Sequence, residues 1–207
     1  IIKDIIRAYR IPILEVSGYE ADDVIGTLAT EAGRQGIITY MMTPDKDYGQ
    51  LVSDNVFMYR PKHSGGFEVM GIDEIKAKFN IRSTEQVIDM LGLMGDSSDN
   101  IPGCPGVGEK TAQKLVAEFG SIENLLAHTD QLKGALKTKV EANREMITFS
   151  KFLATIKVDV PIKLDMTTLV REEPDEEKLR KIFEELEFRT LIDRVLKKSG
   201  APLSSSS

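Results

Sequence analysis

The most specific stretch of the chain is residues 101–115, which read IPGCPGVGEKTAQKL. Its glycines at positions 106 and 108 stand immediately before a predicted helix. Glycine lets a backbone approach a phosphate closely, and the first turn of a helix offers free N–H groups to an anion. The residues that we expect to contact nucleic acid here are Gly106, Val107, Gly108, Lys110, Thr111 and Lys114.

The stretch lies between two predicted helices, residues 84–94 with Ser83 or Thr84 as N-cap, and residues 109–118. This arrangement predicts a helix–hairpin–helix unit, which binds the nucleic-acid backbone with little sequence preference. A nucleotide-binding P-loop is excluded, because Glu109 stands where its lysine is required and no strand is predicted before the loop. An ordinary Gly/Pro turn between two helices remains an alternative.

Upstream of this stretch the pattern alternates between strands and helices, which predicts a parallel α/β sheet. The run IITYMM is rich in β-branched and apolar residues and predicts a buried strand. A turn is expected at residues 63–66. The expected strands are residues 13–16, 37–42, 55–59 and 67–70, and the expected helices are residues 1–10, 20–34 and 46–51.

Downstream of residue 70 the pattern becomes helical. Helices are expected at residues 72–79, 84–94, 109–118, 121–127, about 138–150 and about 175–187, with an extended piece at 157–164. We therefore expect an α/β core in residues 1–82, an all-helical region in residues 83–198 and a linker or tail in residues 199–207.

The net charge of −6 is confined to the first half of the chain. Residues 1–100 hold 10 Lys and Arg against 16 Asp and Glu, whereas the remaining residues hold 17 of each. Seven of these acids fall in three tight clusters, and local groups of carboxylates are what hard divalent cations require. The clustered acids are Glu20, Asp22, Asp23, Asp45, Asp47, Asp96 and Asp99.

The positions of these clusters favour a shared cation site over a solvated acidic surface. The first two clusters follow predicted strands, and ligands of α/β sheets bind beyond the carboxyl ends of strands. Each cluster also has a structural explanation: helix N-terminal acids, a Pro-Asp turn or an Asx cap. Carboxylates packed together without a cation should repel one another, and we expect some of them to have raised pKa values.

Other features exclude several classes of protein. Cys104 is the single cysteine, so an internal disulfide is impossible and a reducing, cytoplasmic setting is favoured. His63 and His128 are far apart, which argues against a zinc site. The apolar runs are too short for a membrane span, and the first residue, Ile1, suggests a piece of a longer protein.

Four sequence words, in this order and spacing, resemble the 5′-nuclease domains of bacterial DNA polymerase I and the wider flap-endonuclease group. They are GYEADD (18–23), TPDKD (43–47), GDSSDNIPG (95–103) and PGVGEKTA (105–112). The resemblance covers residues 1–198. It implies an incomplete PIN-like parallel-sheet core followed by an all-helical helix–hairpin–helix region. It also implies metal-dependent hydrolysis of a phosphodiester near the 5′ end of a DNA flap or nick, as in primer removal and repair.

The resemblance further implies roles for single residues. Glu20 and Asp22 would ligate a first Mg²⁺ or Mn²⁺, with Asp23 beside them. Asp45, Asp47, Asp96 and Asp99 would hold a second, directly or through water. The hairpin at Gly106 and Gly108 would also bind K⁺ through its carbonyl groups, with Lys110 near the DNA phosphates. Polymerase domains would follow in the parent protein, in the bacterial cytoplasm.

The chain departs from the family pattern before Ile1, where a strand with a further metal-ligating Asp and a mobile arch are expected. We therefore expect the fragment to be inactive by itself. Two other functions remain open. One is a non-catalytic helix–hairpin–helix DNA-binding module, and the other is a PIN-type ribonuclease, against which the long helical region argues.

Overall fold

A computed structural model describes residues 1–62 and 64–196, which form two compact units. The larger unit comprises Val16–Leu164, and the smaller one joins Ile1–Glu15 to the chain that begins at Asp165. The tail expected at residues 199–207 and His63 of the expected turn lie outside the described residues. No described helix combines the length and the apolar character needed to cross a bilayer.

The smaller unit is built from helices at the two ends of the chain: α1 (Ile2–Ala8), α9 (Glu176–Glu185) and α10 (Arg189–Val195). Ala8 of α1 is buried with Leu179 and Phe183 of α9. The N–H of Asp175 donates to the carbonyl of Ala8 at 2.8 Å, which joins the two segments. α1 and α9 were predicted, whereas α10 was not. Glu187, with a φ of 56°, separates α10 from α9.

The sheet of the larger unit has three strands in the order β1 (Thr39–Met42), β2 (Val56–Pro61) and β3 (Phe67–Met70). β1 and β2 are parallel, with Thr39 opposite Val56, as the sequence predicted. β2 and β3 are antiparallel, with Met58 opposite Met70, so the sheet that was predicted to be parallel is mixed. The short connection from β2 to β3 explains this, since a parallel return requires a crossover of a dozen or more residues.

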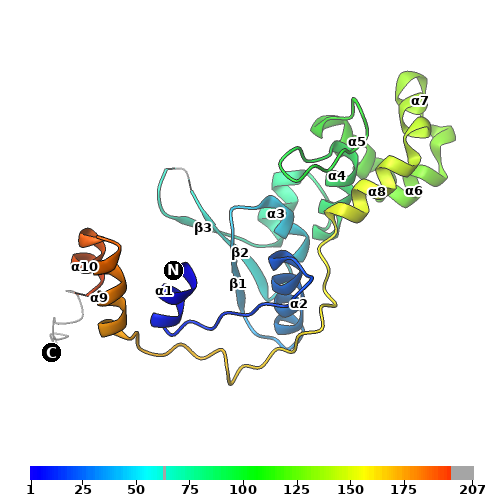
Figure 1. The fold of residues 1–207 in the computed structure, drawn as a ribbon. Helices are drawn as coiled ribbons and strands as arrows, with labels where there is room; N and C mark the ends of the chain where they lie inside the picture. The colour runs from blue at the N-terminus through cyan, green and yellow to red at the C-terminus, as the bar shows by residue number, and fades with distance from the viewer. Residues whose placement is uncertain (63, 197–207) are drawn as a thin grey trace, which may run out of the picture. The chain divides into compact units, whose positions relative to one another are not determined.

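The two faces of the sheet have different surroundings. Met41 and Met58 are buried on the face that packs against α2 (Ala21–Arg34), which lies alongside β1 and β2 in Figure 1. On the opposite face Tyr40 and Met42 are 56% and 72% exposed, so the strand that was predicted to be buried is buried on one face only. Alternation of the side chains gives β1 one core face and one open face.

The strand predicted at residues 13–16 does not form, and these residues have no regular secondary structure. A strand is stable only when a neighbouring strand satisfies its N–H and C=O groups. No strand in the described part of the chain pairs with residues 13–16. The apolar residues therefore predicted a strand that the described structure does not contain.

The rest of the larger unit is helical, and in Figure 1 helices α4–α8 group together beyond α3. The elements are η1 (Lys46–Leu51), α3 (Ile72–Phe79), η2 (Thr84–Gln86), α4 (Val87–Met94), α5 (Glu109–Phe119), α6 (Ile122–Ala127), η3 (Thr129–Gln131), α7 (Gly134–Ala142) and α8 (Arg144–Ala154). The single helix expected near residues 138–150 is instead two helices. Asn143 breaks it with a non-helical backbone, and its side-chain amide donates to the carbonyl of Lys139 at 2.8 Å.

A buried ion pair joins three of these helices. Asp89 of α4 accepts the N–H of Ile122 at the start of α6 at 2.8 Å, and the Nζ of Lys151 of α8 at 2.6 Å. Lys151 also donates to Glu123 at 2.7 Å. Because the charge of Asp89 is fully partnered, it fixes α6 and α8 against α4 without leaving an isolated carboxylate in the core.

The loop between α4 and α5 is closed by a very tight backbone approach. Gly95 and Gly103 have φ values of 74° and 64°. A Cβ atom on Gly103 would lie 2.3 Å from the backbone nitrogen of Gly95. Asp96 and Ile101 exchange two backbone hydrogen bonds of 2.8 Å inside this closure. Glycine is therefore required at position 103 by both its conformation and the lack of space.

We predict that Gly103→Ala destabilises the protein by more than about 3 kcal/mol, since overlap with Gly95 adds to the roughly 1–2 kcal/mol of a left-handed alanine. Gly134→Ala is the matched control, because Gly134 has a similar φ of 58° but no atom within 4 Å of its Cβ position. Urea unfolding followed by circular dichroism measures both. Equal losses in the two variants would show that the close approach contributes nothing.

Candidate functional site

The second acid cluster lies where β1 runs into η1. Asp45 is the N-cap of η1, and its carboxylate accepts the N–H of Asp47 at 2.9 Å. The N–H of Asp45 itself donates to the Thr43 hydroxyl at 3.1 Å. Turn chemistry therefore accounts for one oxygen of Asp45. It does not account for Asp47, whose side chain is buried within the first turn.

The third cluster is carried by the loop between Gly95 and Gly103. The Asp96 carboxylate accepts the N–H of Ser98 at 2.9 Å and also its hydroxyl, so an Asx turn is present as the alternative reading suggested. The closed loop nevertheless brings this cluster to the second one. One carboxylate oxygen from each of Asp47, Asp96 and Asp99 lies within 4.8 Å of the others. These three residues are called the Asp trio below.

The first cluster opens helix α2. Glu20 is the N-cap of α2, with Asp22 and Asp23 in its first turn. The Tyr48 hydroxyl donates to Asp22 at 2.7 Å, and the Lys157 N–H donates to Asp23 at 2.9 Å. Asp23 thus fixes the chain that follows α8, whereas Glu20 makes no side-chain capping bond to α2.

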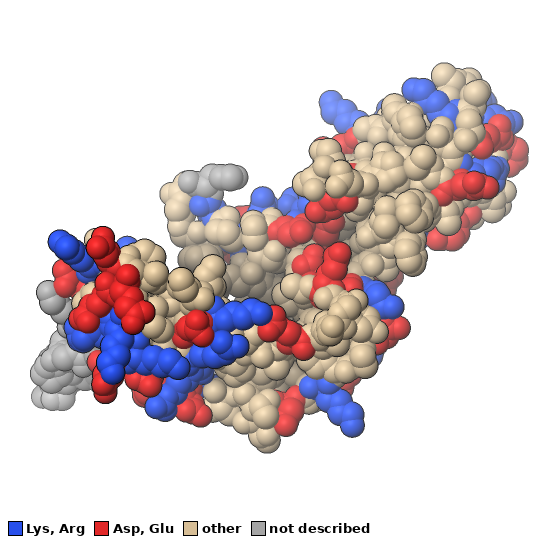
Figure 2. Space-filling model, viewed as in Figure 1, with Lys and Arg blue, Asp and Glu red and all other residues tan. Residues whose placement is uncertain are grey.

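The clusters meet in one pocket of about 250 Å³ in the larger unit. Figure 2 shows acidic side chains gathered on this unit between the sheet and the helices α4–α8. The end of α8 and residues 155–156 form the uncharged wall. Six of the seven predicted acids line the pocket: Glu20, Asp22, Asp23, Asp45, Asp47 and Asp99. The seventh, Asp96, lines the adjoining hollow with Lys46.

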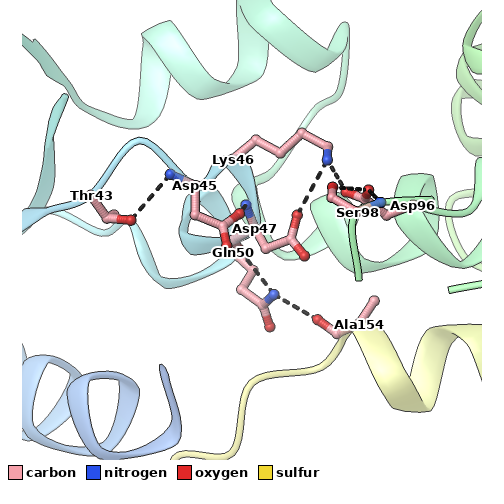
Figure 3. Close-up of polar contacts among 8 residues, drawn as sticks. All are labelled: Thr43, Asp45, Lys46, Asp47, Gln50, Asp96, Ser98 and Ala154. Carbon is pink, nitrogen blue, oxygen red and sulfur yellow. Dashed lines mark hydrogen bonds and ion pairs between the residues drawn. The ribbon is translucent and has the colours of Figure 1, made fainter. Parts of the chain in front are cut away.

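Two polar residues of this site were missed in the sequence (Figure 3). Gln50 donates to the carbonyls of Asp47 at 3.0 Å and Ala154 at 2.8 Å, and it accepts the N–H of Ile156 at 2.9 Å. It thereby ties η1 to the end of α8. Lys46 forms an ion pair with Asp96 and lies 3.8 Å from the Asp47 carboxylate. Its position between two aspartates in TPDKD was the available signal.

Asp47 is the electrostatically strained member of the site. Its Oδ1 atom is buried without a hydrogen bond, because Lys46 is too distant to donate one. Burial, and then the neighbouring charge of Asp45, raise the pKa of Asp47 to about 7. Crowding of the acids was expected to raise some of their pKa values, and the pKa of Asp47 is raised, with burial as the larger cause and the charge of Asp45 as the next.

The other acids respond to their own partners. Burial and the charges of Asp96 and Asp45 raise the pKa of Asp99. Burial opposes ionisation of Asp96 too, but hydrogen bonds from Lys46 and Ser98 outweigh it and lower its pKa. The site therefore combines Asp96, which is stabilised as an anion, with Asp47 and Asp99, whose ionised forms a nearby cation would stabilise.

The predicted hairpin lies between α4 and α5. Gly106 has a φ of 78°, and Gly108 is the N-cap of α5 with free space around its Cβ position. Val107 is buried, so its side chain belongs to the core. Lys110 and Lys114 are exposed one turn apart, and Thr111 is half-buried. A Cβ on Gly106 would lie 2.6 Å from the Nζ of Lys139, a nearby cation of α7 that sequence spacing could not reveal.

Two family models match the chain in succession. Residues 1–80 match the N-terminal resolvase-like domain of 5′-3′ exonucleases, and residues 82–177 match their C-terminal SAM fold. The chain is 41% identical over 197 residues to DNA polymerase I of Bacillus caldotenax, which covers 94% of this chain and 22% of that protein. The chain thus spans about a fifth of the length of this curated relative.

Solved structures share the fold. A T5 5′-exonuclease with bound zinc superposes with a TM-score of 0.62 at 23% identity, over 69% of this chain and 52% of that one. The catalytic core of Rad2 in complex with DNA superposes with a TM-score of 0.63 at 16% identity, over 95% of this chain and 67% of that one. The α/β core followed by helices is therefore confirmed as the fold class.

We predict that Asp47→Asn stabilises the metal-free protein above pH 7 by about 1–3 kcal/mol. Each pKa unit corresponds to about 1.4 kcal/mol, and the sum is reduced here because solvent screens part of the interaction. The native carboxyl keeps its proton up to a pH of about 7. The unfolded carboxyl loses its proton near pH 4. Wild-type stability should therefore fall between these two pH values, and the variant should lack that fall.

The check is urea unfolding in EDTA across this pH range. Asp89→Asn is the control, because Asp89 is also buried but is held by Lys151 and the N–H of Ile122. Loss of that partnered charge should destabilise the protein at every pH tested. A loss of stability in Asp47→Asn at pH 8 would contradict the prediction.

Proposed function

Since this chain belongs to the 5′-3′ exonuclease family, we propose that it forms the part of a 5′ nuclease that binds the metal ions and the DNA. Its substrate would be DNA with a 5′ flap or a nick, and its reaction the hydrolysis of a phosphodiester bond. The observation that carries this proposal is the buried Oδ1 of Asp47 within the Asp trio, which receives no hydrogen bond from the described residues and has the Lys46 ammonium only at 3.8 Å. A cation bound directly to this oxygen would offset the cost of its burial.

The donor set fits divalent cations that prefer oxygen ligands. The described residues that line the pocket offer carboxylates and include no histidine or cysteine, a set suited to Mg²⁺ or Mn²⁺. We propose that the Asp trio, with Asp45 beside it, holds one cation and that Glu20 and Asp22 hold another. Bound cations of this kind activate a water molecule and stabilise the leaving oxygen of a phosphodiester.

The protein's own residues would prepare this chemistry. The Asp45 carboxylate holds the turn that presents Asp47, and Asp23 holds the chain at Lys157 that borders the pocket. Gln50 keeps the end of α8 against η1, which fixes the uncharged wall of the pocket relative to Asp47. These residues position the ligands, and none of them is needed as a proton acceptor.

The hairpin would hold the DNA backbone. Gly106 and Gly108 expose their backbone at the start of α5, where the helix offers N–H groups without intrahelical partners. Lys110 and Lys114 add charge for phosphates, and Thr111 a hydroxyl. We propose, following the family resemblance, that carbonyl groups of this hairpin also bind K⁺.

The wider setting is proposed by analogy with the DNA polymerase I relatives, of which the chain matches a fifth. We propose a nuclease that works with a DNA polymerase in replication and repair, in the bacterial cytoplasm. In this proposal residues 1–82 belong to the nuclease core and residues 83–198 to the DNA-binding region. The long helical region supports a flap nuclease over a PIN-type ribonuclease.

We predict that Mg²⁺ or Mn²⁺ raises the thermal midpoint of the wild-type protein by several degrees. A ligand at about 100 times its Kd adds roughly 2.7 kcal/mol, and each kcal/mol shifts the midpoint of a domain of this size by about 2–4 °C. Asp47→Asn should remove most of this gain. Asp54→Asn, at an exposed aspartate outside the pocket, should keep it.

Differential scanning calorimetry with EDTA and with each metal makes the comparison. An unchanged midpoint for the wild-type protein at every metal concentration would sink the metal proposal. Salt-sensitive DNA binding in that case would favour the alternative of a non-catalytic helix–hairpin–helix module.

We predict that Lys110→Gln combined with Lys114→Gln weakens the binding of nicked duplex DNA and lowers the salt slope by about 1–2. Each lysine that contacts a phosphate releases counterions when DNA binds. The matched control is Lys178→Gln with Lys181→Gln, two exposed lysines on α9. Fluorescence anisotropy over a range of KCl concentrations measures both pairs, and an equal effect of the two pairs would contradict a role for the hairpin.

A further inference from the structure

Lys46 places a positive charge inside the acidic site. Its ammonium forms an ion pair with Asp96 and lies 3.8 Å from Asp47 Oδ1. Figure 3 shows this ammonium close to both carboxylates. The lysine is therefore held as a cation by two members of the Asp trio.

This ammonium and a divalent cation compete for the same oxygens. The carboxylates of the Asp trio converge within 4.8 Å, and Lys46 contacts two of the three. A divalent cation bound among these oxygens would lie close to the Lys46 ammonium, and the two positive charges would repel each other strongly in a partly buried site. We propose that Lys46 is a built-in counter-ion, which neutralises the Asp trio in the metal-free protein and leaves Asp96 when a divalent cation binds.

The two partners differ in their freedom to move. Asp96 has a side chain only 5% exposed and is held by Ser98 and by the backbone pairing with Ile101. The Lys46 side chain is 33% exposed and lines an open hollow with Asn100 and Pro102. Lysine carries its charge on a flexible stem and is strongly hydrated, so it can withdraw into water while the aspartate stays.

The position of Lys46 has a thermodynamic consequence. Whatever the ion pair adds to the stability of the metal-free protein must be given up on metal binding. Lys46 would thus keep the acids together before metal arrives and weaken the apparent metal affinity by the same factor. This inference rests on the proposed metal site, since without a metal nothing displaces the lysine.

The test compares Lys46→Gln with wild type by thermal unfolding in EDTA and in saturating Mg²⁺. We expect the variant to lose about 2–6 °C in EDTA, where the ion pair is present, and less than about 1 °C in Mg²⁺. Lys151→Gln is the control, since Lys151 pairs with Asp89 outside the pocket. Its loss should be equal in the two buffers.

Titration with Mg²⁺ gives a second readout. We expect Lys46→Gln to bind Mg²⁺ about tenfold more tightly than wild type, whereas Lys46→Arg should restore stability in EDTA and bind no more tightly than wild type. An equal loss of stability in both buffers, with unchanged affinity, would show that Lys46 stays on Asp96 and would overturn the inference.

A direct observation is the Nζ resonance of Lys46 in ¹⁵N-labelled protein, assigned by its absence in Lys46→Gln. The ion pair should protect this resonance in EDTA, and Mg²⁺ should remove that protection. If wild type gains no stability from metal, the proposed function fails. If wild type gains stability but the Lys46 resonance stays protected, the inference alone fails.

Discussion

The acidic pocket depends on the contact between the backbones of Gly95 and Gly103. This contact closes the loop that follows α4 and points Asp96 and Asp99 back toward the turn after β1. Without it, the acids of the helical part and those of the sheet would belong to separate surfaces. The N–H of Gly103 donates to the buried Ser150 hydroxyl at 2.9 Å, so helix α8 fixes the closure from behind.

Two buried aspartates of the same unit show what distinguishes a structural charge from a functional one. Asp89 accepts hydrogen bonds from Lys151 and from the N–H of Ile122 and joins three helices, which offsets part of the burial that raises its pKa. Asp47 has equal reason to be neutral but has no donor on Oδ1, and its pKa rises to about 7. A folded chain retains such an unsatisfied carboxylate at a cost in stability, which a ligand of opposite charge would offset.

The local patterns predicted most of the helices and the neighbourhood of the acids. Apolar spacing placed α2, and helices were predicted close to the observed bounds of α3 and α5. The acid clusters were recognised because several acids lay close together in sequence. The errors came from partners distant in the chain. Residues 13–16 have strand-forming side chains but no described neighbour, and Asn143 breaks a helix whose apolar spacing continues.

The same limit applies to the site. The partners of Lys46, Gln50 and Lys139 include residues 50, 104 and 33 positions away, respectively. The sequence signalled Lys46 by its place between two aspartates, but no local spacing could reveal these distant partners. Several aspartates close together form a pattern that indicates a cation site. A single lysine among them forms no such pattern and only reduces the net charge of the cluster.

The connection between α4 and α5 unites two kinds of anion chemistry within a few residues. Up to Gly103 the loop gathers carboxylates, and from Gly106 it exposes backbone and the start of a helix. Carboxylates repel a phosphate unless cations lie between them, whereas helix N-termini attract it directly. In the proposed function, a phosphate held at the hairpin would therefore approach the pocket only when the pocket is neutralised. The Gly95–Gly103 contact closes the loop on the acidic side of this connection, so the change from one chemistry to the other takes place within the next few residues.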